Sequence, residues 1–241
     1  MYLGKMFRSS CLSFLSFLLP LSQAVHHATP HPQLTVRTPH FDSNITIPKS
    51  TREYWMRQTQ QALLDSPSPC PFAAFATVIV NHTGDNGLGD LICTGVNSGT
   101  RTGTQILHGE IAAILNCSDV LQDPTGRFQL TPAETLAAFT DLSLYTNAES
   151  CPMCASAVRW TGFKEYIYGT SIDALVDYGW GQIHLSSAEV FAASGDLPSS
   201  TFLIGDVLSN ETDPYFAWQF DDTVSCPVGC ERRNGRCRAA R

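Results

Sequence analysis

Two short stretches of this 241-residue chain carry side chains that could together bind a metal ion and move a proton. One is the His-Gly-Glu sequence at 108–110, and the other is the Cys-Pro-Met-Cys sequence at 151–154. Zinc prefers nitrogen and thiolate ligands in a tetrahedron, and a catalytic zinc site keeps its fourth position for water or substrate. Three residues suit the protein positions: His108, Cys151 and Cys154. The pattern therefore predicts Zn²⁺ as the cofactor, and it leaves the carboxylate of Glu110 as a spare group two residues from a ligand.

The elements around these stretches are expected to place the ligands at helix N-termini. An apolar run at 111–115 indicates a buried helix that begins at the first stretch. Residues 142–146 are typical of a strand that leads through a polar loop into Cys151, and residues 155–160 indicate a second helix. The unpaired N–H groups and the dipole at a helix N-terminus favour thiolate over thiol. Both ligand sets would thus lie where a zinc–thiolate site is stabilised.

Each half of the pattern has another interpretation when it is taken alone. A Cys-x-x-Cys sequence also occurs in redox motifs and disulfides, and a lone histidine is often a core residue. A disulfide oxidoreductase would use Cys151 and Cys154 without metal and would lose activity on thiol alkylation. That interpretation leaves His108 and Glu110 unexplained, so the zinc site is favoured.

Four stretches carry a resemblance to a known family. They are Pro71-Phe72-Ala73-Ala74, Gly95-Val96-Asn97, His108-Gly109-Glu110 and the run from Leu144 to Cys154. On these motifs, over roughly residues 50–210, the chain resembles the cytidine/deoxycytidylate deaminase superfamily. The Cys-Pro-Met-Cys motif is most similar to that of one branch of this superfamily, the guanine deaminases and tRNA adenosine deaminases. Two features depart from the family pattern: Ser150 stands where the family usually has proline, and the stretch between the two motifs is longer than in compact members.

The resemblance implies a role for each site residue. Glu110 would take a proton from a zinc-activated water and deliver it to a ring nitrogen and to the departing ammonia. Asn97 would hold the substrate, and main-chain N–H groups near Gly109 and Cys151 would orient the ring. Some aromatic residues are candidates for stacking on that ring, although aromatics more often pack in cores: Phe72, Trp160 and the segment 178–181.

Alternating patterns along the chain predict an α/β fold. A capping box at Ser50 and Glu53 predicts a helix through Leu64, and two β-rich runs at 75–81 and 90–96 predict a hairpin. Five further elements are expected downstream: a short helix at 132–138, a strand at 165–169, a helix at 186–193, a strand at 202–207 and a helix at 214–220. Strands that alternate with helices after a hairpin predict a three-layer α/β/α sandwich around a mixed sheet. The resemblance implies the same fold with five strands.

Residues 1–24 are typical of a secretory signal peptide. Lys5 and Arg8 precede an apolar run from Cys11 to Leu21, which is too short for a comfortable transmembrane helix, and small residues at 22–24 suit cleavage. No other segment of the sequence is apolar enough to span a bilayer, so no membrane partner is expected. The rest of the chain divides into three predicted parts: an extended arm at 25–49, a deaminase domain at 50–220 and a cysteine-containing basic tail at 221–241.

Sequons and cysteines agree with an extracellular location. Glycosylation sequons begin at four asparagines: Asn44, Asn81, Asn116 and Asn210. Of the nine cysteines, Cys11 would leave with the signal peptide and two would bind zinc. The other six are disulfide candidates whose pairing stays open at this point: Cys70, Cys93, Cys117, Cys226, Cys230 and Cys237. A second zinc site at the last three is the alternative, although no fourth ligand lies nearby.

The charge of the chain bears on its partners. The formal net charge is −7, and signal cleavage would remove Lys5 and Arg8 but no acidic residue. An acidic protein repels phosphate backbones, so a polynucleotide substrate is not expected. Five arginines make the C-terminus basic, which is typical of a solvated terminus, with a nucleic-acid arm as the alternative: Arg232, Arg233, Arg236, Arg238 and Arg241.

These observations together predict a secreted, zinc-dependent hydrolytic deaminase of a free nucleobase or nucleoside, with a guanine-like purine favoured. A cytosine-type substrate and a non-nucleobase amino-heterocycle are the alternative substrates. A catalytically inactive secreted binding or effector protein on the same scaffold is the alternative from another class. The intact ligand set and Glu110 argue against it, because a decayed site would usually lose one of them. The resemblance also implies a homo-oligomer.

Overall fold

The computed structural model describes residues 47–68, 70–83 and 87–240, which all belong to one compact unit of the chain. The predicted signal peptide, most of the predicted arm and the sequon at Asn44 lie outside these described residues. Within the described ranges, none of the helices is both long and apolar enough to cross a membrane.

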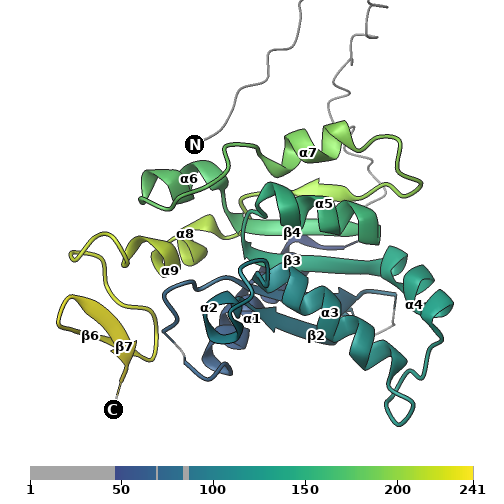
Figure 1. The fold of residues 1–241 in the computed structure, drawn as a ribbon, viewed down its shortest axis with the longest axis horizontal. Helices are drawn as coiled ribbons and strands as arrows, with labels where there is room; N and C mark the ends of the chain where they lie inside the picture. The colour runs from purple at the N-terminus through teal and green to yellow at the C-terminus, as the bar shows by residue number, and fades with distance from the viewer. Residues whose placement is uncertain (1–46, 69, 84–86, 241) are drawn as a thin grey trace, which may run out of the picture. The chain divides into compact units, whose positions relative to one another are not determined.

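Five strands form the central sheet (Figure 1): β1 (Ala76–Asn81), β2 (Asp90–Val96), β3 (Leu142–Ala148), β4 (Glu165–Thr170) and β5 (Phe202–Ile204). Their order across the sheet is β2-β1-β3-β4-β5. Strand β1 pairs antiparallel with β2 and β3, whereas β3, β4 and β5 run parallel to one another. The sheet is therefore mixed and five-stranded, as predicted, and β1 and β2 form the predicted hairpin.

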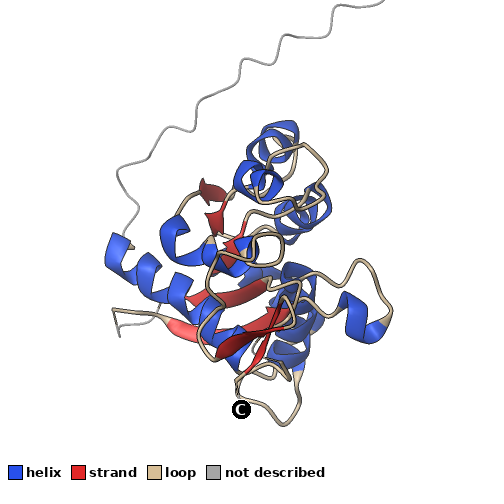
Figure 2. Ribbon diagram, turned by 90° about the vertical axis from the view of Figure 1, so that its left-hand side faces the viewer, coloured by secondary structure: helices blue, strands red, loops and turns tan. Residues whose placement is uncertain are grey.

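Helices connect the strands and lie on both sides of the sheet (Figure 2). Their bounds are α1 (Lys49–Leu64), α2 (Gly99–Thr102), α3 (Gly109–Gln122), α4 (Pro132–Ala138), the 3₁₀ helix η1 (Phe139–Asp141), α5 (Pro152–Thr161), α6 (Ile172–Asp177), α7 (Ser187–Ala193), α8 (Ser209–Thr212) and α9 (Pro214–Ala217). The helices predicted around the two ligand stretches are α3 and α5.

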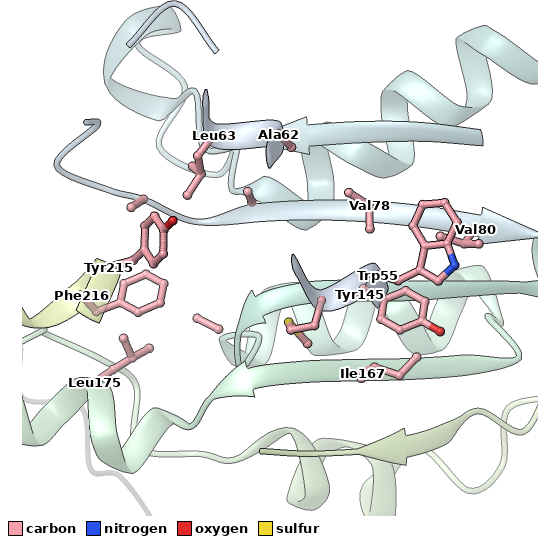
Figure 3. Close-up of a cluster of buried hydrophobic side chains, with 14 residues drawn as sticks. Trp55, Ala62, Leu63, Val78, Val80, Tyr145, Ile167, Leu175, Tyr215 and Phe216 are labelled. Carbon is pink, nitrogen blue, oxygen red and sulfur yellow. The ribbon is translucent and has the colours of Figure 1, made fainter. Parts of the chain in front are cut away.

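Each face of the sheet carries its own hydrophobic core. Side chains alternate along β1, so that Val78 and Val80 belong to one core and Ile79 to the other. The first core includes Trp55 and Leu63 of α1 and residues of α9 (Figure 3). The second core packs the opposite face against α3 and α5. Two cores on one sheet give the predicted three-layer α/β/α sandwich, and they fix α3 and α5 on the same face.

Four local predictions need correction. The predicted capping box is wrong: Ser50 lies inside α1, whose N-cap is Pro48 without a side-chain cap bond, because the extended backbone of Pro48 already ends the preceding segment. Two elements end earlier than predicted: strand β5 ends at Ile204 and helix α9 ends at Ala217, each three residues before the predicted end. Helix α6 was not predicted, since its six residues are too few to establish a clear periodicity.

The C-terminal segment, predicted only as a tail, forms a disulfide-bonded hairpin. Strands β6 (Cys230–Arg233) and β7 (Arg236–Ala239) pair antiparallel. Disulfides join Cys70 to Cys230 and Cys226 to Cys237, so the alternative of a second zinc site at these cysteines is wrong. A third disulfide, between Cys93 and Cys117, joins β2 to α3 on the second face of the sheet.

Candidate active site

The sheet topology brings the two ligand stretches together. Strands β2 and β3 lie on either side of β1 and both run antiparallel to it, so their C-terminal ends lie at the same end of the sheet. Helix α3 follows β2 after a connection that contains α2, and α5 follows β3 after a short loop. His108 is the N-cap residue of α3 and Cys151 is the N-cap residue of α5. Two helix N-termini therefore meet over one end of the sheet, as the sequence predicted.

The three predicted ligands form one cluster, in which their nitrogen and sulfur atoms all lie within 4.8 Å of one another. The Sγ atoms of Cys151 and Cys154 each lie 3.6 Å from Nδ1 of His108. A tetrahedral zinc ion, with bonds of about 2.3 Å to sulfur and about 2.05 Å to nitrogen, places such atoms about 3.6 Å apart. The donor set and its spacing fit zinc, and both cysteines are free thiols rather than a disulfide. The disulfide oxidoreductase interpretation therefore has no support in this geometry.

Electrostatics at the cluster favour a thiolate. A hydrogen bond from Cys154 to the Cys151 sulfur, together with the neighbouring His108, lowers the pKa of Cys151 to about 4. The hydrogen bond between Cys151 and His108 raises the pKa of His108, because the imidazolium is stabilised beside a thiolate. Cys151 is thus poised as an anionic ligand at neutral pH, and zinc, when bound, keeps coordinating thiols deprotonated.

Glu110 lies in the first turn of α3 and is 5% exposed. Burial raises the pKa of its carboxyl group, and a hydrogen bond of 2.7 Å from the Ser150 hydroxyl to Oε1 opposes that rise. An acid and base at ambient pH needs a pKa nearer to neutrality than that of an exposed carboxylate. Burial moves Glu110 in that direction.

A cavity of about 380 Å³ opens at this cluster. His108, Glu110 and Cys151 line it on the side of the ligand helices. The other lining residues come from the segment before β1, the connection after β2, the loop and first turn that lead into α5, and the segment after α6: Ala73, Phe75, Asn97, Gln105, Glu149, Met153 and residues 180–183. A larger groove of about 710 Å³ shares Ala73 and Asn97 with this cavity but contains none of the ligands. We place the candidate active site in the smaller cavity, because its walls hold the zinc cluster and Glu110.

The residues predicted to contact substrate divide into two groups. Asn97 lines the cavity, and its Oδ1 accepts a hydrogen bond of 3.1 Å from the Gly99 N–H. Trp180 also lines the cavity, and its ring lies 5.3 Å from that of Phe72, which lines the adjoining groove. Trp160 is 76% exposed and lines neither space. Stacking by Trp160 on a bound ring is therefore wrong, because its side chain points outward from α5 into solvent.

Glu149 and Ser150 were not predicted to have roles, although both flank Cys151. Both oxygens of the buried Glu149 accept main-chain hydrogen bonds, one of 2.9 Å from Ile172 and one of 2.7 Å from Ser187. Ser150 contacts Glu110. The sequence did mark Ser150 as unusual, since it departs from the family pattern. Its contact with Glu110 could not be inferred, because 40 residues separate Ser150 from Glu110.

The predicted sequons within the described residues lie at or near the surface. Asn116 on α3 and Asn210 on α8 are exposed, and Asn81 at the end of β1 is half-buried. The side-chain amide of Asn116 donates a hydrogen bond of 2.9 Å to the Thr94 carbonyl. Glycosylation at these positions remains a prediction.

Comparisons with known proteins agree with this geometry. Over residues 49–170 the chain matches the family described as "Cytidine and deoxycytidylate deaminase zinc-binding region". It is 34% identical over 94 residues to guanine deaminase of Bacillus subtilis (strain 168), a match that spans 39% of this chain and 48% of that protein. The chain thus spans about half the length of this curated relative.

Solved structures of deaminases are also similar. A guanine deaminase structure from Nitrosomonas europaea is 16% identical, with a TM-score of 0.47, over 71% of this chain and 84% of that chain. A structure from a study of tRNA:A34 deaminases is 16% identical, with a TM-score of 0.46, over 69% of this chain and 99% of that chain. The family match covers half of the sequence and contains His108, Glu110, Cys151 and Cys154. The chain therefore belongs to the family of cytidine and deoxycytidylate deaminase zinc-binding domains, and zinc is its cofactor.

Proposed function

We propose that this protein is a secreted, zinc-dependent hydrolase that deaminates a free nucleobase or nucleoside, with a guanine-like purine favoured. The observation that carries the proposal is the buried Glu110 carboxylate, which lines the same cavity as His108 and Cys151. Burial makes a carboxyl group costly to ionise, and acids placed in this way are concentrated at functional sites. Here it stands beside a zinc-ligand cluster, where hydrolytic chemistry needs a proton carrier.

The residues have distinct tasks in this proposal. Zinc held by His108, Cys151 and Cys154 would lower the pKa of a water molecule in its fourth position toward neutrality. Glu110 accepts one proton from the attacking water and passes it to a ring nitrogen of the substrate. It then takes the second proton from the hydroxyl group newly bonded to the ring carbon and gives it to the amino group, which leaves as ammonia. The first turns of α3 and α5 direct main-chain N–H groups toward this end of the sheet, where they orient the ring and stabilise developing negative charge.

The walls of the cavity support a flat, bicyclic substrate. Phe75 and Trp180 supply aromatic surface, and Asn97 supplies an amide that can bond to a ring edge. The volume of about 380 Å³ is at the low end of the roughly 300–1,000 Å³ of small-molecule sites. The relative that matches over 94 residues is a guanine deaminase, which is why a guanine-like purine is favoured over a cytosine-type ring.

Secretion is supported by the cysteines as well as by the predicted signal. Three disulfides link six cysteines that do not belong to the zinc cluster. Disulfides persist in oxidising compartments and are rare in the cytosol. The zinc-cluster thiols stay free in the structure, so a metal ligand role would also protect them from oxidation.

The decisive experiment measures ammonia release from the purified protein with guanine, adenine, cytosine and their nucleosides, with zinc quantified in parallel. We expect one zinc ion per chain and turnover of a purine. The Glu110→Gln variant should keep its zinc and fold but lose about 100- to 10,000-fold in kcat, because it can no longer carry the proton.

Glu53→Gln is the matched control, since Glu53 lies on α1 in a surface ion pair with Lys49, away from the cavity. It should retain full activity. Full activity of Glu110→Gln would refute the mechanism. Zinc binding without turnover of any compound would favour an amino-heterocycle outside this panel or the inactive binding protein.

A further inference from the structure

Ser150 donates two hydrogen bonds from a fully buried position in the loop between β3 and α5. Its hydroxyl donates to Oε1 of Glu110 at 2.7 Å, and its main-chain N–H donates to the hydroxyl of Tyr166 at 2.6 Å. Proline has neither a hydroxyl nor an N–H, so neither bond could form if proline occupied this position. Glu110 therefore has a hydrogen-bond donor that a proline at position 150 could not supply.

The contact with Glu110 crosses from one ligand-bearing segment to the other. Glu110 belongs to α3, whereas Ser150 directly precedes Cys151 at the start of α5. The last torsion of a glutamate side chain is broad and roughly two-fold, so packing alone does not determine which oxygen faces a given neighbour. The hydrogen bond from Ser150 to Oε1 removes that freedom.

Ser150 is itself held in place by a closed ring of hydrogen bonds. Its N–H donates to the Tyr166 hydroxyl, which lies 3.3 Å from Oγ of Ser187. The Ser187 hydroxyl donates back to the Ser150 carbonyl at 3.2 Å. Tyr166 and Ser187 are both fully buried, so water does not compete for these bonds. The ring anchors the main chain of Ser150 on both sides, and the side chain is therefore a fixed donor.

We propose that Ser150 is a positioning residue that orients the carboxylate of Glu110 for proton transfer. The inference rests on the proposed deaminase function, since it assigns Ser150 to the same reaction. Ser150 itself does not contact the reacting atoms: it acts through Oε1 of Glu110, so its loss should slow the chemical step without weakening substrate binding.

The test compares Ser150→Ala with the wild-type protein on whichever panel compound the wild type deaminates. Alanine removes the hydroxyl and keeps the N–H bond to Tyr166. Removing a hydrogen bond to a reacting carboxylate should lower kcat by about 10- to 100-fold. We expect that loss with KM and zinc content unchanged. Ser150→Thr, which keeps the hydroxyl, should restore kcat.

Ser143→Ala, on the strand β3 that precedes the Ser150 loop, is a matched control. Ser143 is also fully buried, and its hydroxyl lies 3.5 Å from a carboxylate oxygen of Glu165 rather than of Glu110. Its removal should leave kcat unchanged. A loss of kcat equal to that of Ser150→Ala would mean a general packing effect and would overturn the proposal.

Other outcomes separate this inference from the proposed function. Wild-type kcat in Ser150→Ala together with an inactive Glu110→Gln would refute the role of Ser150 and leave the deaminase proposal intact. Loss of zinc from Ser150→Ala would make Ser150 a support for Cys151 and also refute it. A crystal structure of Ser150→Ala tests the orientation without turnover: we expect the Glu110 carboxylate to rotate, and an unchanged carboxylate would overturn the inference even if no substrate were found.

Discussion

The two turns that supply the zinc ligands are constructed in opposite ways. The turn at 97–108, which ends at His108 and which we call the histidine turn, lies at the surface, and its Ile106 is 59% exposed. Its first residue, Asn97, donates to the Phe75 carbonyl, but the other main-chain bonds that the turn donates stay within it, such as Leu107 N–H to Thr104 and His108 N–H to Ile106. The turn at 147–151, which we call the cysteine turn, is buried up to Ser150. One ligand, His108, therefore comes from a turn at the surface, whereas the two cysteine ligands lie at and just after a buried turn.

The cysteine turn is bonded to five other elements or their flanking residues. The side chain of Asn147 donates to the Ala74 carbonyl at 2.7 Å and accepts from the Ala76 N–H at 2.9 Å. Glu149 accepts N–H groups at the starts of α6 and α7, and Ser150 donates to β4 and α3. Buried polar groups with all partners in place make a rigid unit. The cysteine turn is therefore ordered by the fold itself.

The histidine turn is positioned by the elements on either side of it. The Cys93–Cys117 disulfide joins β2 to α3 across the turn. Gly95 of β2 also lies against the first turns of α3, where a Cβ atom would overlap the main-chain atoms Ala113 N and Gly109 O. This close approach brings Glu110 and His108 down onto the sheet. Polar bonds position one ligand set, whereas backbone contact and a covalent bond position the other.

The largest expected effect comes from a substitution that prevents the close approach of β2 to α3 at Gly95. Gly95→Ala places a methyl group against α3 main chain that cannot rotate away, so α3 must shift. Overpacking of this kind lowers the free energy of unfolding by about 3 kcal/mol. We also expect zinc content to fall, because His108 moves away from Cys151 and Cys154. Thermal unfolding and zinc analysis measure the two effects.

Gly195→Ala controls for the intrinsic difference between glycine and alanine. The nearest atom to a Cβ at Gly195 is 3.9 Å away, so the substitution should be tolerated. Wild-type stability and zinc content in Gly95→Ala would mean that the β2–α3 contact does not position the histidine turn.

The contrast between the turns also explains what could be predicted from the sequence. His108, Glu110, Cys151 and Cys154 were identified because ligand type and spacing are local properties. Helix α4 was predicted with its observed bounds, because Pro132 at N1 and the Thr131 cap are local as well.

The contacts that position the ligands could not be predicted. Gly95 against α3, Ser150 against Glu110 and the pairing of Cys70 with Cys230 join residues far apart in sequence. A single sequence contains no signal for such pairs, and six cysteines alone allow fifteen pairings. The hairpin at 230–239 was missed for a related reason, since its four-residue strands depend on two disulfides rather than on a hydrophobic pattern.

A smaller effect is expected from Glu149→Gln in the cysteine turn. Glutamine can accept one of the two main-chain N–H groups, but its amide then faces the other, which leaves a buried donor unpaired. The loss of stability should be about 2 kcal/mol. The segment between α6 and α7 carries cavity residues 180–183 and is tied at both ends by Glu149. We therefore expect a rise in KM that exceeds any fall in kcat, with zinc retained.

Glu189→Gln is the matched control, because Glu189 caps the same α7 N-terminus from an exposed position. It should change stability by only a few tenths of a kcal/mol, roughly the value of one exposed helix-terminus interaction. Equal effects of the two variants would show that the N-terminus of α7, rather than the buried bond to Glu149, sets the cavity wall.

Removal of zinc is expected to have the smallest and most local effect. It tests directly the difference between the histidine turn and the cysteine turn. Metal binding stabilises the segments that supply ligands, and it matters most where the fold alone does not order them. The amides of Leu107 and His108 donate to neighbours within the surface turn, whereas those of Glu149 and Ser150 donate to Thr170 and to the Tyr166 hydroxyl. Hydrogen exchange with and without a chelator should therefore quicken at Leu107 and His108 by about tenfold, or ~1.4 kcal/mol of local opening, and change little at Glu149 and Ser150. Equal acceleration in both turns would mean that the buried bonds do not order the cysteine turn without its metal, and that zinc organises the two ligand sets alike.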